Sequence, residues 1–185
     1  MKREEFNQMP QLVIEFLQYM EVIKNKSSLT IIEYASDLRT FFRYMKIIRG
    51  LVPKDVPFDE IDISDIDLAF IKKITLNDAY DFLSYCRNDR DNSANTRSRK
   101  VSSIRAFFKF LDVQKAVLDD NPMRDLDTPK IKKALPKYLT LEQSLDLLKN
   151  IDGKFKERDY CIITLFLNCG LRLSELVSLN YNDIR

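Results

Sequence analysis

The sequence predicts a mainly α-helical protein, and three observations carry this prediction. Glycine occurs only 3 times in 185 residues, which favours helices because glycine is costly in a helix interior. Apolar residues recur at spacings of three and four through most of the chain, which is the pattern of amphipathic helices. Several of these stretches follow a hydroxyl or acidic residue in the position of an N-cap. With 45% hydrophobic residues, the chain suffices for one domain, or for a domain and part of another.

Two helices are expected in the first 50 residues. The first covers about residues 10–24, and its apolar face is predicted to comprise Leu12, Phe16, Tyr19 and Ile23. The second is expected to open with a capping box from Thr30 to Glu33, with Ser27 or Ser28 as earlier alternatives, and to end near Gly50. Its buried stripe is predicted to comprise Leu38, Phe41, Met45 and Ile48.

The next segments alternate between irregular and helical patterns. Residues 51–74 are rich in aspartate and proline, which predicts an ordered connector with little regular structure. A third helix is expected to start after a cap at Thr75 and to reach about Arg87. A fourth covers about residues 94–111, with a buried stripe of Val101, Ile104, Phe108 and Leu111.

The outer face of this fourth helix is basic. At 100° per residue, Arg99, Ser102, Ala106 and Lys109 align, with Arg105 at the flank, and no acid of the helix lies among them. Positive charges, hydroxyl donors and small side chains suit a helix that lies against the phosphates of a duplex. The alternative for such a face in isolation is a solvated basic surface.

A proline-punctuated segment divides the chain in two. Residues 120–136 contain three prolines and a run of lysines, which predicts an extended basic linker, although an ordinary solvated linker fits as well. We therefore expect a domain over residues 1–126, a linker over 127–136 and the start of another domain over 137–185. Helices are expected near 141–150, after a capping box from Thr140 to Gln143, and near 157–168 and 172–179.

A short motif near the end of the chain has the properties of a phosphate-binding site. Gly170 stands where a helix needs a left-handed C-terminal cap, and Arg172 is expected in the first turn of the following helix. Its planar guanidinium matches two oxygens of a phosphate, and Glu175, three residues later, is placed to hold it. The alternative is a surface arginine–glutamate pair.

Four segments together, in this order and spacing, resemble the tyrosine recombinases of the phage-integrase and Xer-like kind. The resemblance covers nearly the whole chain. It rests on Gly170–Leu176 with Arg158, Asp159 and Tyr160 before it; on Pro129, Lys130, Leu135, Pro136, Tyr138, Leu139, Thr140 and Glu142; on Ser27, Thr30, Tyr34, Asp37, Leu38 and Phe41; and on Thr96, Arg99, Lys100, Ser102, Arg105, Phe107 and Phe108.

The resemblance implies a SAM-like four-helix core-binding DNA domain, followed by the first helices of a recombinase catalytic domain. It implies double-stranded DNA as the partner, bound through Ser27, Thr30, Thr96, Arg99, Lys100, Ser102, Arg105, Lys109, Lys130, Lys132 and Lys133. It further implies self-association or a partner recombinase on DNA.

In that family a tyrosine attacks a DNA phosphodiester without metal or nucleotide cofactor, and arginines, a lysine and histidines assist. Arg172 matches the first catalytic arginine and Glu175 a supporting residue, whereas the chain contains no histidine. We therefore expect a truncated or interrupted recombinase that binds DNA but does not cut it. A DNA-binding regulator derived from a recombinase is the runner-up, and a helical protein-interaction domain is a third possibility.

Composition limits the remaining classes. The net charge of +2 indicates no partner by itself, so only its distribution is informative. Cys86, Cys161 and Cys169 lack metal-ligand spacing and are expected to be reduced thiols, with no metal bound. The sequence shows no signal peptide and no apolar stretch of membrane-spanning length, so we expect a cytoplasmic protein with no membrane contact.

Overall fold

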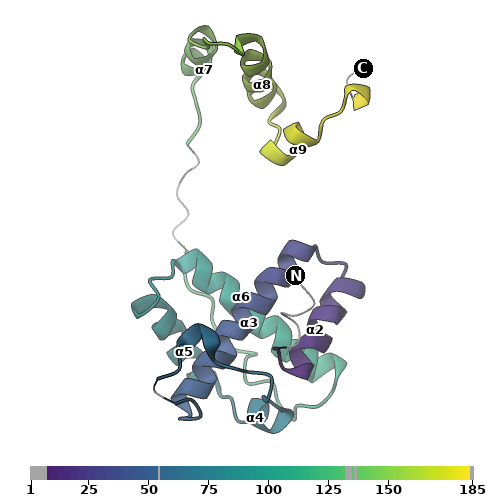
Figure 1. Cartoon of the computed structure of the whole chain (residues 1–185), viewed down its shortest axis with the longest axis vertical. Helices are drawn as coiled ribbons and strands as arrows, with labels where there is room; N and C mark the ends of the chain where they lie inside the picture. Colours follow the sequence, from purple (N-terminus) through teal and green to yellow (C-terminus); the bar gives the residue numbers. More distant parts are fainter. Residues whose placement is uncertain (1–7, 54, 132–134, 136, 184–185) are drawn as a thin grey trace. The chain divides into compact units, whose positions relative to one another are not determined.

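The computed structural model describes residues 8–53, 55–131, 135 and 137–183 (Figure 1). The chain divides into two compact units, Met1–Lys132 and Lys133–Arg185, and each is described here by itself. Every regular element in the described part is helical, which confirms the predicted mainly α class.

The first unit contains most of the helices. They are α2 (Gln11–Val22), α3 (Ser28–Ile48), α4 (Leu68–Lys72), α5 (Leu76–Asn88) and α6 (Ala94–Lys109). A single 3-10 turn covers Phe58–Glu60, and a π-helical turn over Phe110–Gln114 continues α6. The central element is α3, which packs against α2, α5 and α6 and crosses α6 in the middle of the unit (Figure 1).

Aromatic side chains fill the space between these helices. Phe107 of α6 packs edge-on against Phe42 of α3 and Phe16 of α2, with ring centroids 5.7 and 5.6 Å apart. Phe41 packs in the same manner against Phe82 of α5 at 5.2 Å. All five rings are fully buried, so edge-to-face contacts add to a large burial of apolar surface and fix α3 against its three neighbours.

The N-terminal caps correct one sequence prediction and confirm another. Ser27, not Thr30, caps α3: its hydroxyl accepts the Thr30 backbone N–H at 3.4 Å. The predicted capping box from Thr30 to Glu33 is therefore wrong, and the alternative cap at Ser27 is right. Thr75 caps α5 as predicted, in a capping box with Asp78.

The buried stripes of α3 and α6 match the prediction except at Ile48, whereas α2 buries Val13, Phe16, Leu17 and Met20 and leaves the predicted Leu12 and Tyr19 half-buried. Leu38, Phe41 and Met45 are buried as expected, and so are the four predicted positions of α6 and its continuation. Ile23 and Ile48 are exposed, because α2 ends before Ile23 and Ile48 is the last residue of α3.

The connector from residue 51 to 74 is ordered, as predicted, and it contributes to the core. Besides its 3-10 turn and α4, it places five side chains in the core: Ile61, Ile63, Ile66, Ile71 and Ile74. Its carboxylate and carbonyl oxygens accept hydrogen bonds from basic side chains of the second half of α3. Lys46 donates to Asp65 at 2.8 Å and to the Asp62 carbonyl at 2.9 Å, and Arg43 pairs with Asp59 at 3.2 Å. The connector therefore neutralises this half of α3.

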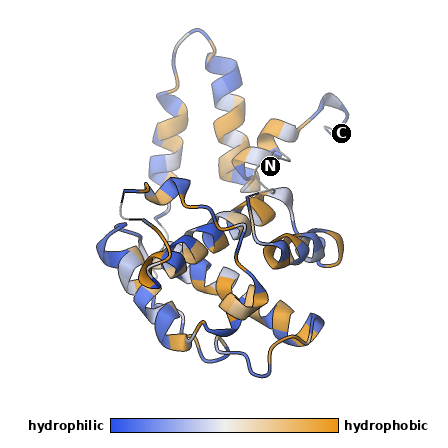
Figure 2. Ribbon diagram, turned by 60° about the horizontal axis from the view of Figure 1, so that its bottom comes forward, coloured by the Kyte–Doolittle hydropathy of each residue, from blue (hydrophilic) through white to orange (hydrophobic). Residues whose placement is uncertain are grey.

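The second unit contains α7 (Leu141–Lys149), α8 (Lys156–Cys169), α9 (Leu173–Ser178) and a 3-10 turn over Tyr181–Asp183. Thr140 and Gln143 form the predicted capping box, and Gly170 ends α8 with a left-handed φ of 62°, also as predicted. Helices α7 and α8 lie side by side, and both carry hydrophobic residues (Figure 2). None of the described residues of this unit is buried, so its apolar side chains lack a core.

The three cysteines are free thiols. Cys86 is buried in the core, and this burial raises the pKa of its thiol to about 11, whereas Cys161 and Cys169 are exposed on α8. Within the described ranges, no acidic or cysteine residues cluster in a way that would hold a metal ion, and no helix is long and apolar enough to cross a membrane.

Candidate nucleic-acid interface

One buried carboxylate joins α3 to α6. Asp37 has no exposed side-chain surface, and it accepts hydrogen bonds from Arg99 Nη1 at 2.7 Å, Lys100 Nζ at 3.1 Å and Ser103 Oγ at 2.8 Å. A buried carboxylate needs such partners, because an unpaired charge in the interior is strongly unfavourable. The three donors come from two consecutive turns of α6, so Asp37 fixes the rotation of α6 about its axis.

Arg99 also contacts a second acid on its outer side. Its Nη1 pairs with the Glu33 carboxylate and lies 3.5 Å from the Glu33 carbonyl oxygen. Arg99 and Glu33 keep 39% and 46% of their side-chain surface exposed. The sequence shows no acid on this face among the residues of α6. In the structure, two acids of α3, Glu33 and Asp37, contact Arg99 on this face. Glu33 and Asp37 are four residues apart on α3, as are Arg99 and Ser103 on α6. This matched spacing is the sequence feature that could have indicated the contact between the two helices.

Lys100 lies in the interior rather than on the outer face. Its side chain is 8% exposed and its ammonium group is held by Asp37. Position 100 falls on the side of α6 that faces α3, next to buried Val101. A DNA contact for Lys100 stays a prediction, and this burial argues against it.

The remaining predicted residues of α6 do form an exposed basic surface. Ser102, Arg105 and Lys109 are exposed, and the small side chain of Ala106 lies between them; we call these four residues the outer face of α6. A hollow of about 340 Å³ borders this face, and Arg105, Lys109 and Arg124 are among its lining residues. The outer face thus combines cations with space for an approaching backbone.

The two crossing helices begin in the same way. The hydroxyl of Ser27 caps α3 and lies 3.0 Å from the Thr30 hydroxyl, and Ser93 caps α6 and lies 3.0 Å from the Thr96 hydroxyl. The Ser-x-x-Thr spacing occurs at the start of both helices and is the sequence pattern that indicates Ser93 as the N-cap of α6, a residue that the sequence analysis did not name. Helix N-termini carry partial positive charge and suit phosphate binding.

The contact between Glu33 and Arg99 joins the second turns of α3 and α6, so these N-terminal segments lie close together. The predicted residues Thr30 and Thr96 stand three positions before Glu33 and Arg99 in their helices, and Ser27 is the cap of α3. Lys130 is exposed in a segment without regular structure near the end of the first unit, whereas Lys132 and Lys133 lie outside the described residues.

In the second unit, Arg172 and Glu175 form a closely held pair. Arg172 is the N-cap of α9 rather than a first-turn residue, because its backbone is extended, with ψ at 155°. Its backbone N–H and its Nη1 each donate to a Glu175 oxygen at 2.8 Å. These hydrogen bonds lower the pKa of Glu175, which keeps it ionised. Arg172 still exposes 82% of its side chain, so one of its faces is held and another is available.

Comparison with known proteins agrees with this geometry. Residues 13–115 match the family described as phage integrase, N-terminal SAM-like domain. The chain is 52% identical over 95% of its length to a tyrosine recombinase XerC from Caldanaerobacter subterraneus subsp. tengcongensis, and this match covers 50% of that protein.

More distant relatives match over the same extent. A tyrosine recombinase XerC from Bacillus pumilus is 30% identical over 94% of the chain and 51% of the relative. A tyrosine recombinase XerD from Listeria monocytogenes is 30% identical over 95% of the chain and 54% of the relative. The chain thus spans about half the length of the curated relatives it matches. No solved structure gives a significant match.

The role of Asp37 can be measured as stability. Replacing it by alanine leaves Arg99 and Lys100 without their buried counter-charge, and removing one partner of a buried ion pair costs about 3–5 kcal/mol. We expect Asp37→Ala to lower the free energy of unfolding by that amount in urea titrations. Asp81→Ala, a change at an exposed position of α5, is the control and should cost less than about 0.5 kcal/mol. Equal stability of the two variants would contradict the anchoring role of Asp37.

Proposed function

We propose that this chain provides the DNA-binding part of a site-specific DNA recombinase, because the chain belongs to the tyrosine recombinase family and contains that family's N-terminal SAM-like domain. The observation that carries the proposal is the division of positive charge in the first unit. Cations on the second half of α3 are taken up by the connector, whereas Arg105 and Lys109 make no ion pair with any described residue.

The chemistry of this surface suits a duplex. Exposed cations neutralise phosphates and release their counterions, while hydroxyls and helix N-termini donate further hydrogen bonds to the backbone. The outer face of α6 supplies the cations, and the capped N-termini of α3 and α6 supply the donors. We infer that double-stranded DNA lies against the N-terminal half of α3 and along the exposed side of α6 from Thr96 to Lys109, with Lys130 and the lysines after it adding contacts.

This interface predicts salt-dependent binding. If about four to six phosphates are neutralised, the logarithm of the association constant should fall with the logarithm of salt concentration at a slope of roughly −4 to −5. The double variant Arg105→Ala and Lys109→Ala should make this slope shallower by about 2. Fluorescence anisotropy with a labelled duplex measures both quantities.

A matched control removes the same charge elsewhere. Lys73 and Arg87 are exposed in the first unit but lie outside the proposed interface, so Lys73→Ala with Arg87→Ala should leave the slope nearly unchanged. Equal effects of the two double variants would mean that binding follows net charge alone, and the interface would then be wrong.

In the second unit, we propose that Arg172 is a catalytic residue and that Glu175 positions it. The guanidinium is held on one side by Glu175, and its exposed side would bind the phosphate under attack and stabilise its developing charge. The tyrosine nucleophile and the groups that move protons would come from the part of the recombinase for which this chain has no counterpart. No metal or nucleotide cofactor is needed for that reaction.

The catalytic proposal predicts a selective loss of cleavage. In the full-length recombinase, Arg172→Ala should reduce strand cleavage about 100- to 1,000-fold, as removal of a positioned donor to a transition state commonly does. DNA binding should remain. Trapping of covalent protein on a suicide substrate measures the cleavage step, with Lys156→Ala on exposed α8 as control. Trapping at the control level in Arg172→Ala would contradict the assignment.

We further propose that the second unit associates with another protein surface, either a second copy of this chain or a partner recombinase. Its helices expose large apolar side chains, among them Leu141, Leu173, Val177 and Leu179. Exposed apolar area of this kind marks an interaction surface. A protein that acts in this way on DNA is expected in the cytoplasm.

Self-association can be tested on the isolated chain. Light scattering should show an average mass that rises above the monomer value with concentration, together with binding of an apolar dye. Leu173→Ser with Val177→Ser, four residues apart on α9, should reduce both. Val22→Ser with Ile23→Ser removes exposed apolar surface of the first unit and should change neither. A monomer without dye binding would refute the proposal.

A further inference from the structure

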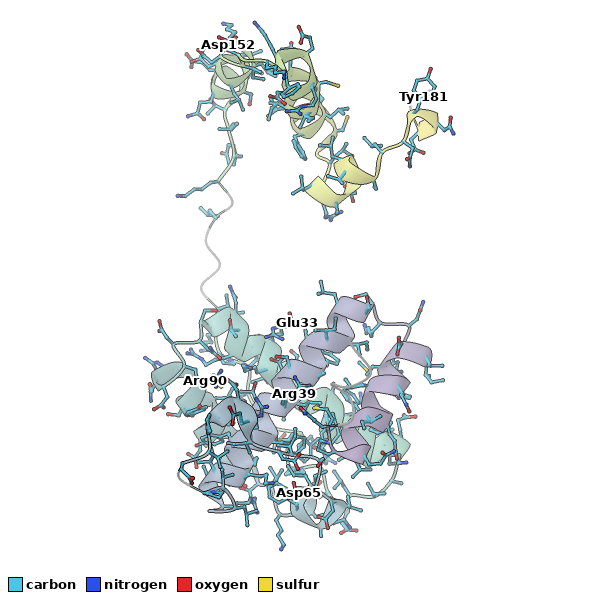
Figure 3. The ribbon with its side chains drawn as sticks, viewed as in Figure 1. Glu33, Arg39, Asp65, Arg90, Asp152 and Tyr181 are labelled. Atoms are coloured by element: carbon cyan, nitrogen blue, oxygen red, sulfur yellow. The ribbon has the colours of Figure 1, made fainter. Side chains whose placement is uncertain are left out.

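We propose that Glu33 occupies Arg99 in the DNA-free protein in place of a DNA phosphate, and that the phosphate displaces it on binding. This inference rests on the proposed DNA-binding function and adds a regulation of affinity to it. Glu33 lies in the second turn of α3, at the end of this helix remote from the acidic connector (Figure 3).

The two acids that contact Arg99 differ in how firmly they are held. Asp37 is fully buried and is fixed by three donors from α6. The Glu33 carboxylate is nearly half exposed, and Arg99 is its one partner among the described residues. Rotation of the Glu33 side chain into solvent therefore breaks a single exposed ion pair, which is worth at most a small free energy. Asp37 would hold Arg99 in place while Glu33 departs.

Arg99 has the donors that such an exchange needs. A guanidinium carries five N–H groups, and the hydrogen bonds that Arg99 donates to described residues come from Nη1. Nε and Nη2 donate no hydrogen bond within the described part of the chain. A phosphate offers two free oxygens to such a planar fork and carries the negative charge that Glu33 now supplies.

A phosphate bound to Arg99 would repel the Glu33 carboxylate, so the contact between Glu33 and Arg99 becomes unfavourable once DNA is bound. Glu33 lies in the second turn of α3 and contacts Arg99, which stands three residues before Ser102 of the outer face of α6, and carboxylates repel phosphates. If Glu33 served only to brace the two helices, its loss would weaken folding and DNA binding together. If it stands in for phosphate, its loss weakens folding slightly and strengthens DNA binding. The two roles therefore predict opposite changes in affinity.

The test is a double-mutant cycle on the intact chain, measured by anisotropy with a labelled duplex at fixed salt. Glu33→Gln should raise affinity roughly three- to fivefold, the range of an exposed ion pair. Glu21→Gln, the same change at an exposed position of α2, is the matched control and should raise it less than twofold. In an Arg99→Gln background the gain from Glu33→Gln should vanish, because no guanidinium remains to be released.

Thermal unfolding verifies that each variant folds, and Arg99→Lys, in which the gain should shrink, replaces Arg99→Gln if the latter does not. The inference is overturned if Glu33→Gln matches Glu21→Gln, lowers affinity, or keeps its full gain without Arg99. Absence of salt-dependent binding by the unmodified chain would overturn the proposed function itself, and the inference with it.

Discussion

The carboxylate of Asp37 is the interaction on which the arrangement of the first unit depends. It is buried where α3 crosses α6, and it binds a guanidinium, an ammonium and a hydroxyl from consecutive turns of α6. The edge-to-face contacts of Phe107 with Phe42 and Phe16 hold the same helices together through their rings. The three hydrogen bonds have defined directions and allow one rotation. That rotation turns Ser102, Arg105 and Lys109 outward and places Arg99 at the edge of the crossing.

Charge is divided along α3. Near its beginning, Glu33 and Asp37 meet basic residues of α6, while toward its end Arg43, Lys46 and Arg49 are paired with acids and carbonyls of the connector and α5. Glu33 and Lys46 are 13 residues apart, about 20 Å along the axis at 1.5 Å per residue, which is more than twice the screening length of about 8 Å in physiological salt. The net charge of +2 of the whole chain therefore conceals a basic region and an acidic region in the first unit.

Local patterns in the sequence predicted most helices, because capping and helical periodicity depend on residues a few positions apart. Thr75, Thr140 and Gly170 were placed correctly on this basis. Contacts between helices were not predictable in the same way. The resemblance implied a DNA contact for Lys100, and its burial follows from the bond with Asp37, 63 residues away. Alternation of isoleucine with aspartate in residues 61–66 was the available signal that the connector joins the core.

The central claim is that DNA meets the first unit along the N-terminal half of α3 and the exposed side of α6 from Thr96 to Lys109. Backbone NMR shifts of the chain, titrated with a short duplex, test it most directly. The account predicts shifts concentrated at residues 27–33 and 96–109, with little change at residues 55–67 of the acidic connector. Shifts centred on the connector, or spread evenly over the unit, would contradict it.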